Sequence, residues 1–380
     1  MRLRILHVVS CLGMGGTEHG VLKIMRGLGH AEFEHQICAV RGVDDNFVRQ
    51  VKVPAKVSAV GRAEPGFQFP LFRLIQLMRE FRPHIVHTRN FGALEAIAAA
   101  RLARVPVAIH SEHGYELEIL GGLPLRRRFV CGALYAMADQ VCTVTRDLRD
   151  YHSEQSWLSP KKFRVIYNGV DTDLFSPRPE LAAALRSEIG IPMDRTVIGS
   201  VGRLVPIKDY KTLLQAAEIL VRQGKDVHVV IVGSGPELPK LQAYAAASPE
   251  LADRFLFLAA SSRVADLLNS LDVFVLPSIS EGMSNTILEA MATGLPVVVS
   301  RAGGNPELVE EGSGGLFDPR DVEALAGHLS RLVDNKNLRR EYGRAARQRA
   351  VDKFSLSGMV QQYRNIYVDL ASSRGVWKGN

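Results

Sequence analysis

The feature that most constrains the fold is a repeated alternation of short apolar runs with segments of helical length. Continuous apolar runs bounded by turn residues are typical of strands buried on both faces of a parallel sheet. In the first half of the chain the runs are 5–9, 35–40, 85–88, 107–111, 141–145 and 163–167, and the helical segments are 17–28, 71–81, 92–104 and 124–138. Strands separated by helices of this length predict a parallel sheet covered on both sides.

The same pattern restarts after a turn-rich, proline-bearing segment at 171–179. Strands are predicted at 197–201, 227–232, 255–258, 273–276 and 296–300, and amphipathic helices at 321–333 and 338–354. A chain of 380 residues is long enough for two cores. We therefore predict an α/β protein with two Rossmann-like domains, at 1–172 and 173–355. Ligands bind such sheets at the carboxyl ends of their strands.

The chemically richest stretch is 277–310, PSISEGMSNTILEAMATGLPVVVSRAGGNPELVE. It holds Glu281 and Glu289 eight residues apart, with a polar turn that opens a helix between them. Free backbone N–H groups at a helix start, here Ser284, Asn285 and Thr286, favour an anion such as a pyrophosphate. A carboxylate on either side can accept hydrogen bonds from sugar hydroxyls. The pattern therefore predicts a binding site for a nucleotide-sugar.

Two cations, Arg203 and Lys208, lie on the loop after the strand at 197–201. A guanidinium can bind a diphosphate through two parallel hydrogen bonds, and an ammonium supplies a point charge. A single surface cation is usually only solvated. Their joint position at a strand end, upstream of the two glutamates, predicts that both contact phosphate.

Three further features are ambiguous from the residues alone. The loop at 13–18 contains Gly15 and Gly16, but it departs from the dinucleotide-binding pattern at Glu18. His113 follows a strand end, where a lone histidine is more often structural, and His110 and Glu112 lie beside it. Gly235 lies in what reads as an ordinary turn between a strand and a helix.

The stretch EGMSNTILEAMATGLPVVVS…GGNPELV resembles the E-x7-E signature of family 4 glycosyltransferases, which are retaining enzymes of the GT-B fold. Asn168 to Asp171 and the Arg203–Lys208 loop also match this family. The resemblance implies two domains that face across a cleft. The first would bind the acceptor and the second the nucleotide-sugar, and a helix near 356–372 would pack back on the first.

The resemblance also assigns roles to residues. It implies that Gly15 and Gly16 lie against the donor phosphate, that His113 lies near the donor sugar, and that Gly235 lies near the base. Arg203 and Lys208 would neutralise the leaving diphosphate, Glu281 would hold the sugar and Glu289 the ribose. No metal and no cofactor are expected, because the cations would replace a metal. An Asp171-x-Asp173 pair, a metal motif in another glycosyltransferase fold, lies in the linker and is interpreted as incidental.

Charge and composition bear on the acceptor. Residues 1–170 hold 23 Lys and Arg against 15 Asp and Glu, whereas the remainder is nearly neutral. The densest run is Arg126 to Arg128, which is either a solvated face or a contact for anionic lipid head groups or an anionic acceptor. We expect a growing lipid-linked glycan or exopolysaccharide as acceptor, at the inner face of a membrane. The N-terminal apolar run reads as a strand rather than a signal peptide, so a cytoplasmic protein is expected.

Three alternatives remain open from the sequence. A sugar-nucleotide epimerase can share the GT-B architecture and would turn over donor without an acceptor. A non-catalytic nucleotide-sugar-binding protein would not need the complete set of two cations and two glutamates. A nucleic-acid-binding protein is suggested only by the isoelectric point of about 9.3, and basic motifs interleaved with aromatic residues are lacking.

Overall fold

The structure is a computed structural model, and it describes residues 2–13, 15–50, 55–61, 70–115, 123–261, 263–310 and 312–378. The chain divides into two compact units. Unit 1 comprises residues 1–168 and 356–380, and unit 2 comprises residues 169–355. Val170 pairs with Ser355 inside unit 2, so the two chain segments that connect the units lie beside each other there.

Unit 1 contains a parallel sheet, and its described residues form seven strands in the order β3-β2-β1-β4-β5-β6-β7. The strands are β1 (Leu3–Leu12), β2 (Phe33–Val43), β3 (Lys56–Ala59), β4 (Ile85–Arg89), β5 (Val107–Glu112), β6 (Gln140–Thr143) and β7 (Phe163–Val165). β1 and β4 pair in parallel at the centre of the sheet. The strand order reverses there, since β2 lies on one side of β1 and β4 on the other.

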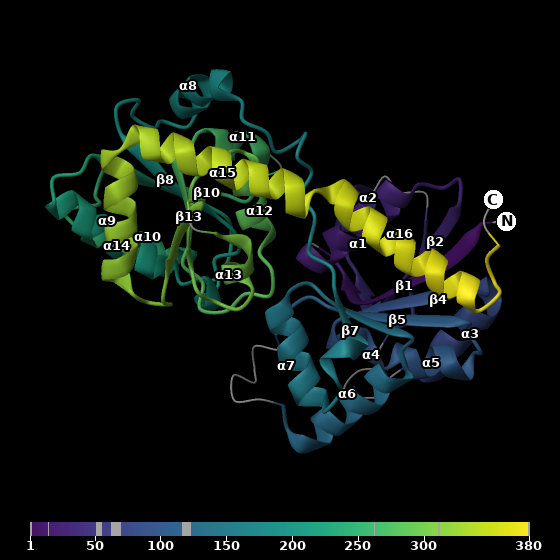
Figure 1. The fold of residues 1–380 in the computed structure, drawn as a ribbon. Helices are drawn as coiled ribbons and strands as arrows, with labels where there is room; N and C mark the ends of the chain where they lie inside the picture. The colour runs from purple at the N-terminus through teal and green to yellow at the C-terminus, as the bar shows by residue number, and fades with distance from the viewer. Residues whose placement is uncertain are drawn as a thin grey trace. The chain divides into compact units, whose positions relative to one another are not determined.

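Helices cover both faces of this sheet (Figure 1). They are α1 (Gly16–Leu28), α2 (Asp45–Gln50), α3 (Leu71–Phe81), α4 (Phe91–Leu94), α5 (Ala96–Leu102), α6 (Leu125–Met137), α7 (Arg146–Ser156), η1 (Pro160–Lys162) and α16 (Leu356–Ser373). One core contains residues of α3, α5 and α6. The core on the other face contains Ile5 and Ile109 of the sheet with Tyr363 and Tyr367 of α16. The C-terminal helix is thus part of unit 1.

Unit 2 repeats the same topology with the strand order β10-β9-β8-β11-β12-β13 in its described residues. Its strands are β8 (Thr196–Val201), β9 (Val227–Val232), β10 (Phe255–Leu258), β11 (Val273–Leu276), β12 (Val297–Ser300) and β13 (Gly314–Phe317). Its helices are α8 (Pro179–Glu188), η2 (Pro206–Lys208), α9 (Tyr210–Arg222), α10 (Leu238–Ala247), α11 (Val264–Asn269), α12 (Asn285–Ala292), α13 (Asn305–Leu308), α14 (Val322–Asp334) and α15 (Lys336–Phe354).

The predicted α/β fold with two Rossmann-like parallel sheets is confirmed. One predicted element differs, since the helix expected at 92–104 is divided into α4 and α5 around Glu95. α4 packs closely against β1 at Gly92, where an added Cβ would lie 2.5 Å from the Ser10 hydroxyl oxygen. Among the helices that the structure describes, none is long and apolar enough to cross a membrane.

Candidate functional site

The topology brings two loops of unit 2 together at the carboxyl edge of its sheet. β8 and β11 are neighbours, although the chain visits β9 and β10 between them. In sheets of this kind the point where the strand order reverses is where ligands bind. The loop after β8 carries Arg203 and Lys208, and the loop after β11 carries Glu281. The backbone N–H of Ile279 donates to the carbonyl of Ile207 at 2.8 Å, which joins the two loops.

Lys208 and Glu281 form an ion pair across this junction. Their side chains are only 15% and 11% exposed. The hydroxyl of Ser278 donates to the same Glu281 oxygen, Oε1, at 2.6 Å. Three side chains from two loops are therefore held at one point, and the pair places a cation and a hydrogen-bond acceptor side by side at the switch point.

The loop that carries Arg203 is held by close backbone packing. A Cβ at Gly235 would lie 2.2 Å from the carbonyl oxygen of Leu204, so a larger residue would push the two loops apart. The Leu204 N–H also donates to the Ser234 carbonyl at 2.9 Å. Arg203 itself is exposed. The structure thus gives Gly235 a clear packing role, and it leaves the Arg203 side chain accessible to a ligand.

α12 begins beside Glu281, as the sequence predicts for a helix that opens after this residue. Its first turn has no hydrogen bond from the side chain of its N-cap residue, Ser284. The Ser284 hydroxyl lies instead 3.1 Å from that of Thr286. Asn285, Thr286 and Glu289 are half-buried on this eight-residue helix. The first-turn N–H groups are therefore not capped by that side chain, as an anion site at a helix start requires.

In unit 1 the predicted glycines lie at the equivalent reversal, between β1 and β4. Gly15 is the N-cap of α1 in an extended conformation, and Gly16 is its first residue. The Glu18 carboxylate lies over Gly15, where an added Cβ would come within 2.2 Å of Oε2. Burial raises the pKa of Glu18, against smaller opposing effects of a backbone hydrogen bond and of Arg89. The loop therefore presents a partly buried carboxylate at the helix start.

His113 is positioned by Asn90, which follows β4. The Asn90 side chain accepts from the His113 backbone N–H at 2.9 Å and donates to the Thr17 hydroxyl at 3.2 Å. Burial and the charge of Arg89 lower the pKa of His113 to about 3. His113 is thus a neutral imidazole whose buried Nε2 atom has no hydrogen-bond partner among the described residues.

The neighbouring His110 and Glu112 have a different environment. His110 Nε2 lies 2.9 Å from Glu112 Oε1, and the Tyr135 hydroxyl donates to the same oxygen at 2.7 Å. Burial would raise the pKa of Glu112, but nearby His152 and His110 and these hydrogen bonds outweigh it and lower the pKa to about 2. Both side chains are fully engaged inside unit 1. This separates His113 from its two neighbours as the candidate for contact with a ligand.

Sequence reasoning missed Ser278, Asn90 and Arg89. Ser278 lies three residues before Glu281, and this spacing could have predicted a hydrogen bond from its hydroxyl to the carboxylate. Arg89 is 1% exposed and lies next to His7 Nδ1 at 3.2 Å and His87 Nδ1 at 3.4 Å. No local pattern distinguishes such an arginine from a solvated one, because its burial depends on packing against another strand, β1, which carries His7.

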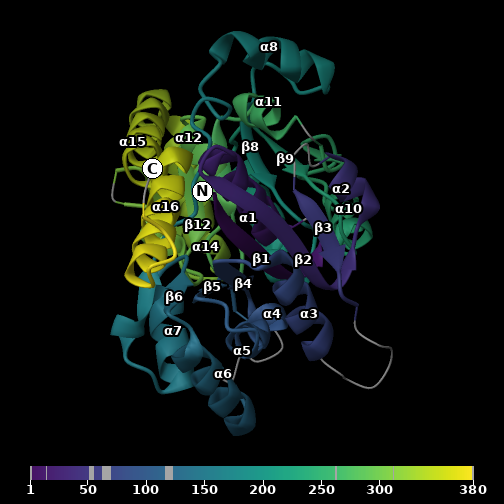
Figure 2. The same cartoon turned by 90° about the vertical axis from the view of Figure 1, so that its right-hand side faces the viewer.

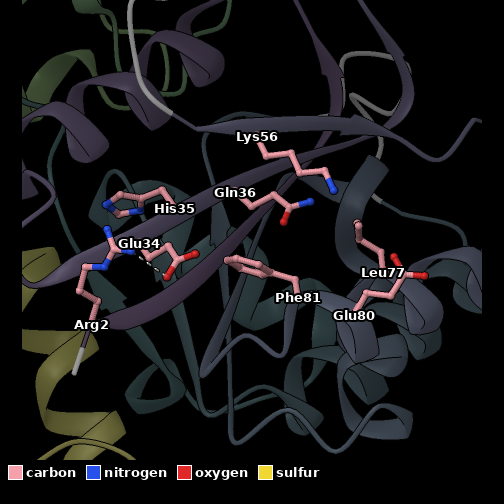
Figure 3. Close-up of a pocket in the computed structure, with 8 residues that line it drawn as sticks. All are labelled: Arg2, Glu34, His35, Gln36, Lys56, Leu77, Glu80 and Phe81. Atoms are coloured by element: carbon pink, nitrogen blue, oxygen red, sulfur yellow. Dashed lines mark ion pairs between the residues drawn. The ribbon is translucent and has the colours of Figure 1, made fainter.

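Two other features do not join this site. Asp171 of the Asp-x-Asp pair uses its Oδ1 to accept from the N–H groups of Asp173 and Leu174, so it caps a turn. A cavity of about 460 Å³ in unit 1 contains none of the predicted site residues (Figure 3). Its lining carries charges of both signs, including the ion pair of Arg2 with Glu34 at 3.5 Å, and consists of Arg2, Glu34, His35, Gln36, Lys56, Leu77, Glu80 and Phe81.

Comparison with known proteins gives matches over both units. Residues 182–349 match the family model described as glycosyl transferases group 1, and residues 14–174 match glycosyltransferase family 4. A galactosyltransferase of Escherichia coli, named for UDP-Gal and α-D-GlcNAc-diphosphoundecaprenol, is 29% identical over 98% of each chain. A GDP-mannose-dependent phosphatidylinositol monomannoside mannosyltransferase of Mycolicibacterium smegmatis is 31% identical over 73% of this chain and 75% of the relative.

The fold has close relatives among solved structures. HepE of Anabaena, solved in complex with UDP, superposes with a TM-score of 0.84 and 22% sequence identity. The superposition covers 96% of this chain and 99% of that one. The fold, with one parallel sheet in each unit, is therefore one that a solved structure shares over nearly its full length.

Proposed function

The chain belongs to glycosyltransferase family 4 and has the GT-B fold, and on this premise we propose that it transfers a sugar from a nucleoside-diphosphate donor to a hydroxyl acceptor with retention of configuration. The observation that carries the proposal is the junction of Lys208, Glu281 and Ser278 beside the start of α12. It combines a cation, a hydrogen-bond acceptor and backbone N–H groups, which are the groups that a sugar diphosphate needs.

In the proposed mechanism, unit 2 holds the donor. Arg203, Lys208 and the N–H groups at Ser284 to Thr286 bind the diphosphate and stabilise its negative charge as the bond to the anomeric carbon breaks. Glu281 accepts hydrogen bonds from the sugar hydroxyls, and Glu289 accepts those of the ribose. The acceptor oxygen attacks on the face that the diphosphate leaves, and a diphosphate oxygen takes its proton. No metal ion is required, since the two cations supply the charge.

Unit 1 binds the acceptor in this proposal, and it also contributes residues to donor binding. Gly15 and Gly16, at the start of α1, lie against the donor phosphate. His113 is neutral and its Nε2 atom has no partner in the part of the chain that the structure describes, so we assign this nitrogen to a hydrogen bond with a hydroxyl of the donor sugar. Gly235 supports the donor loop by packing rather than by a side-chain contact.

For the acceptor we propose a glycan carried on a membrane lipid, as in exopolysaccharide assembly, with the reaction at the cytoplasmic face of the membrane. The support is the surplus of basic residues in the first 170 positions and the similarity to a transferase named for a diphosphoundecaprenol substrate.

The proposal is tested by donor turnover in the presence of EDTA. The protein is incubated with UDP-, GDP- and ADP-sugars, with and without lipid-linked acceptors, and release of nucleoside diphosphate is measured. We expect acceptor-dependent release with one donor, and loss of release in Lys208→Met. Lys211→Met is the matched control, because Lys211 lies on the adjacent helix α9 and is exposed. Conversion of the donor to an epimer without acceptor would contradict the proposal.

A further inference from the structure

The outer face of α6 is apolar, although it is exposed. Leu125 and Phe129 are 72% and 71% exposed, and Val130 and Met137 are 36% and 38% exposed. Ala133 and Ala136 are exposed on the same helix. At 100° per residue these six positions fall within an arc of about 140°. The helix also buries an opposite face, with Leu134 and Tyr135 in the core. A surface helix that is apolar on both faces indicates a second contact.

The three arginines of α6 do not form the basic face that the sequence suggests. The Arg127 guanidinium lies 3.8 Å from the centroid of the Phe91 ring. Arg128 lies over the ring of Trp157 at 4.7 Å and donates to the carbonyls of Glu154 and Gln155 at 2.9 and 3.1 Å. Of the three, only Arg126 is exposed. The outward residues are therefore mainly apolar, with one cation among them.

Aromatic and basic groups lie beside this face. Trp157 is 56% exposed and is held next to α6 by Arg128. Lys161 follows it by four residues and is exposed. α6 itself contains no Asp or Glu. Exposed Leu and Phe with flanking Trp, Arg and Lys is the composition of surfaces that lie in the interface of an anionic bilayer. The exposed cations Arg126 and Lys161 match the negative charge of lipid phosphates.

We propose that the outer face of α6, with Trp157, inserts into the surface of a bilayer that contains anionic lipid. Leu125, Phe129 and Met137 enter the acyl boundary, and Arg126 and Lys161 contact lipid phosphates. Figures 1 and 2 show α6 on the outside of unit 1, across the sheet from α16. This deepens the proposed function, because it names how unit 1 reaches a lipid-carried acceptor.

The test uses vesicles of phosphatidylglycerol and phosphatidylcholine in equal parts, without donor or acceptor. Co-sedimentation measures binding, and Trp157→Phe assigns the fluorescence change, since the other tryptophan, Trp377, is buried. Phe129→Ser is compared with Phe72→Ser, which removes a phenyl group that is 85% exposed on α3 of the same unit. Arg126→Gln removes the exposed cation.

We expect a blue shift of Trp157 on binding. Phe129→Ser combined with Leu125→Ser should weaken binding at least about tenfold, because burial of one such side chain is usually worth that factor. Arg126→Gln should weaken it about fivefold, and Phe72→Ser should leave it unchanged. Because these positions are already exposed, both serine variants should fold normally.

Three outcomes would overturn the inference. One is that the protein does not bind the vesicles, or that the α6 substitutions leave vesicle binding unchanged. Another is an equal loss in Phe72→Ser. The third is light scattering that shows a dimer broken by Phe129→Ser, which would make the face a contact between two copies. Transfer to a water-soluble acceptor should persist in the α6 variants. Its absence from the unsubstituted protein would count against the proposed function and not against membrane insertion.

Discussion

Glu281→Gln and Lys208→Met should change nucleoside-diphosphate affinity in opposite directions. Lys208→Met removes a cation that we assign to the diphosphate, and a hydrogen bond to a charged group is typically worth about 1.5–3 kcal/mol. Affinity should therefore fall about 10- to 100-fold. Glu281→Gln removes a negative charge from the same junction while leaving an oxygen that can accept from Ser278.

The size of the Glu281→Gln effect follows from Coulomb's law. Two unit charges about 6 Å apart at an effective dielectric constant of about 20 repel by about 3 kcal/mol. Loss of this repulsion is partly offset in the variant, because Glu281 also holds Lys208 in place and a glutamine there would hold it less firmly. We expect the free nucleoside diphosphate to bind about three- to tenfold more tightly, while transfer of the sugar falls by about two orders of magnitude or more because the sugar hydroxyls lose their acceptor.

Isothermal titration with the nucleoside diphosphate of the identified donor measures both variants against Lys211→Met, which should bind as the unsubstituted protein does. Weaker binding in Glu281→Gln, to the same extent as in Lys208→Met, would refute the reasoning. It would mean that the ion pair maintains the loop and that neither charge acts on the ligand directly.

Further predictions concern single positions. Gly235→Ala should destabilise unit 2 and lower donor affinity, because its Cβ would overlap the Leu204 carbonyl. An unchanged melting temperature would contradict this. Gly224→Ala is the control for backbone strain alone, because Gly224 has a positive φ but open space around the added Cβ. Glu289→Gln should raise the KM for the donor. Circular dichroism should show that this variant is folded, and a KM close to that of the unsubstituted protein would contradict the placing of Glu289 in the site. His35 is 4% exposed, and burial, His30 and Arg89 lower its pKa to about 4. Because the folded pKa lies below the unfolded one, its contribution to stability is present above about pH 6.5 and is lost as pH falls towards 4, by up to about 3 kcal/mol. His35→Phe should flatten this slope in urea unfolding followed by the tryptophans, both in unit 1; an unchanged slope would contradict the assignment.

The parallel sheets and the E-x7-E helix could be predicted because their signals are local. Each strand is a short run of apolar residues, and the start of α12 is marked by a polar turn between two glutamates. From the sequence, Lys208 and Glu281 could be predicted to lie near each other, but their ion pair could not be predicted. It depends on β8 lying next to β11, which no local pattern encodes.

Other elements could not be predicted from local patterns for identifiable reasons. α7 buries polar residues, His152, Ser153 and Gln155, so it lacks an apolar stripe. β13 is only four residues long and begins with two glycines, Gly314 and Gly315. The arginine run of α6 was visible as charge, but the sequence could not reveal that Arg127 and Arg128 turn towards aromatic rings.

Proton NMR of the first transfer product tests the central claim most directly. The reaction is run in EDTA with the donor that supports turnover, and the coupling constant of the new anomeric proton is compared with that of the donor. The account predicts the same anomeric configuration in product and donor, formed without a metal ion. A product of inverted configuration, or transfer that appears only when a divalent metal is restored, would contradict it.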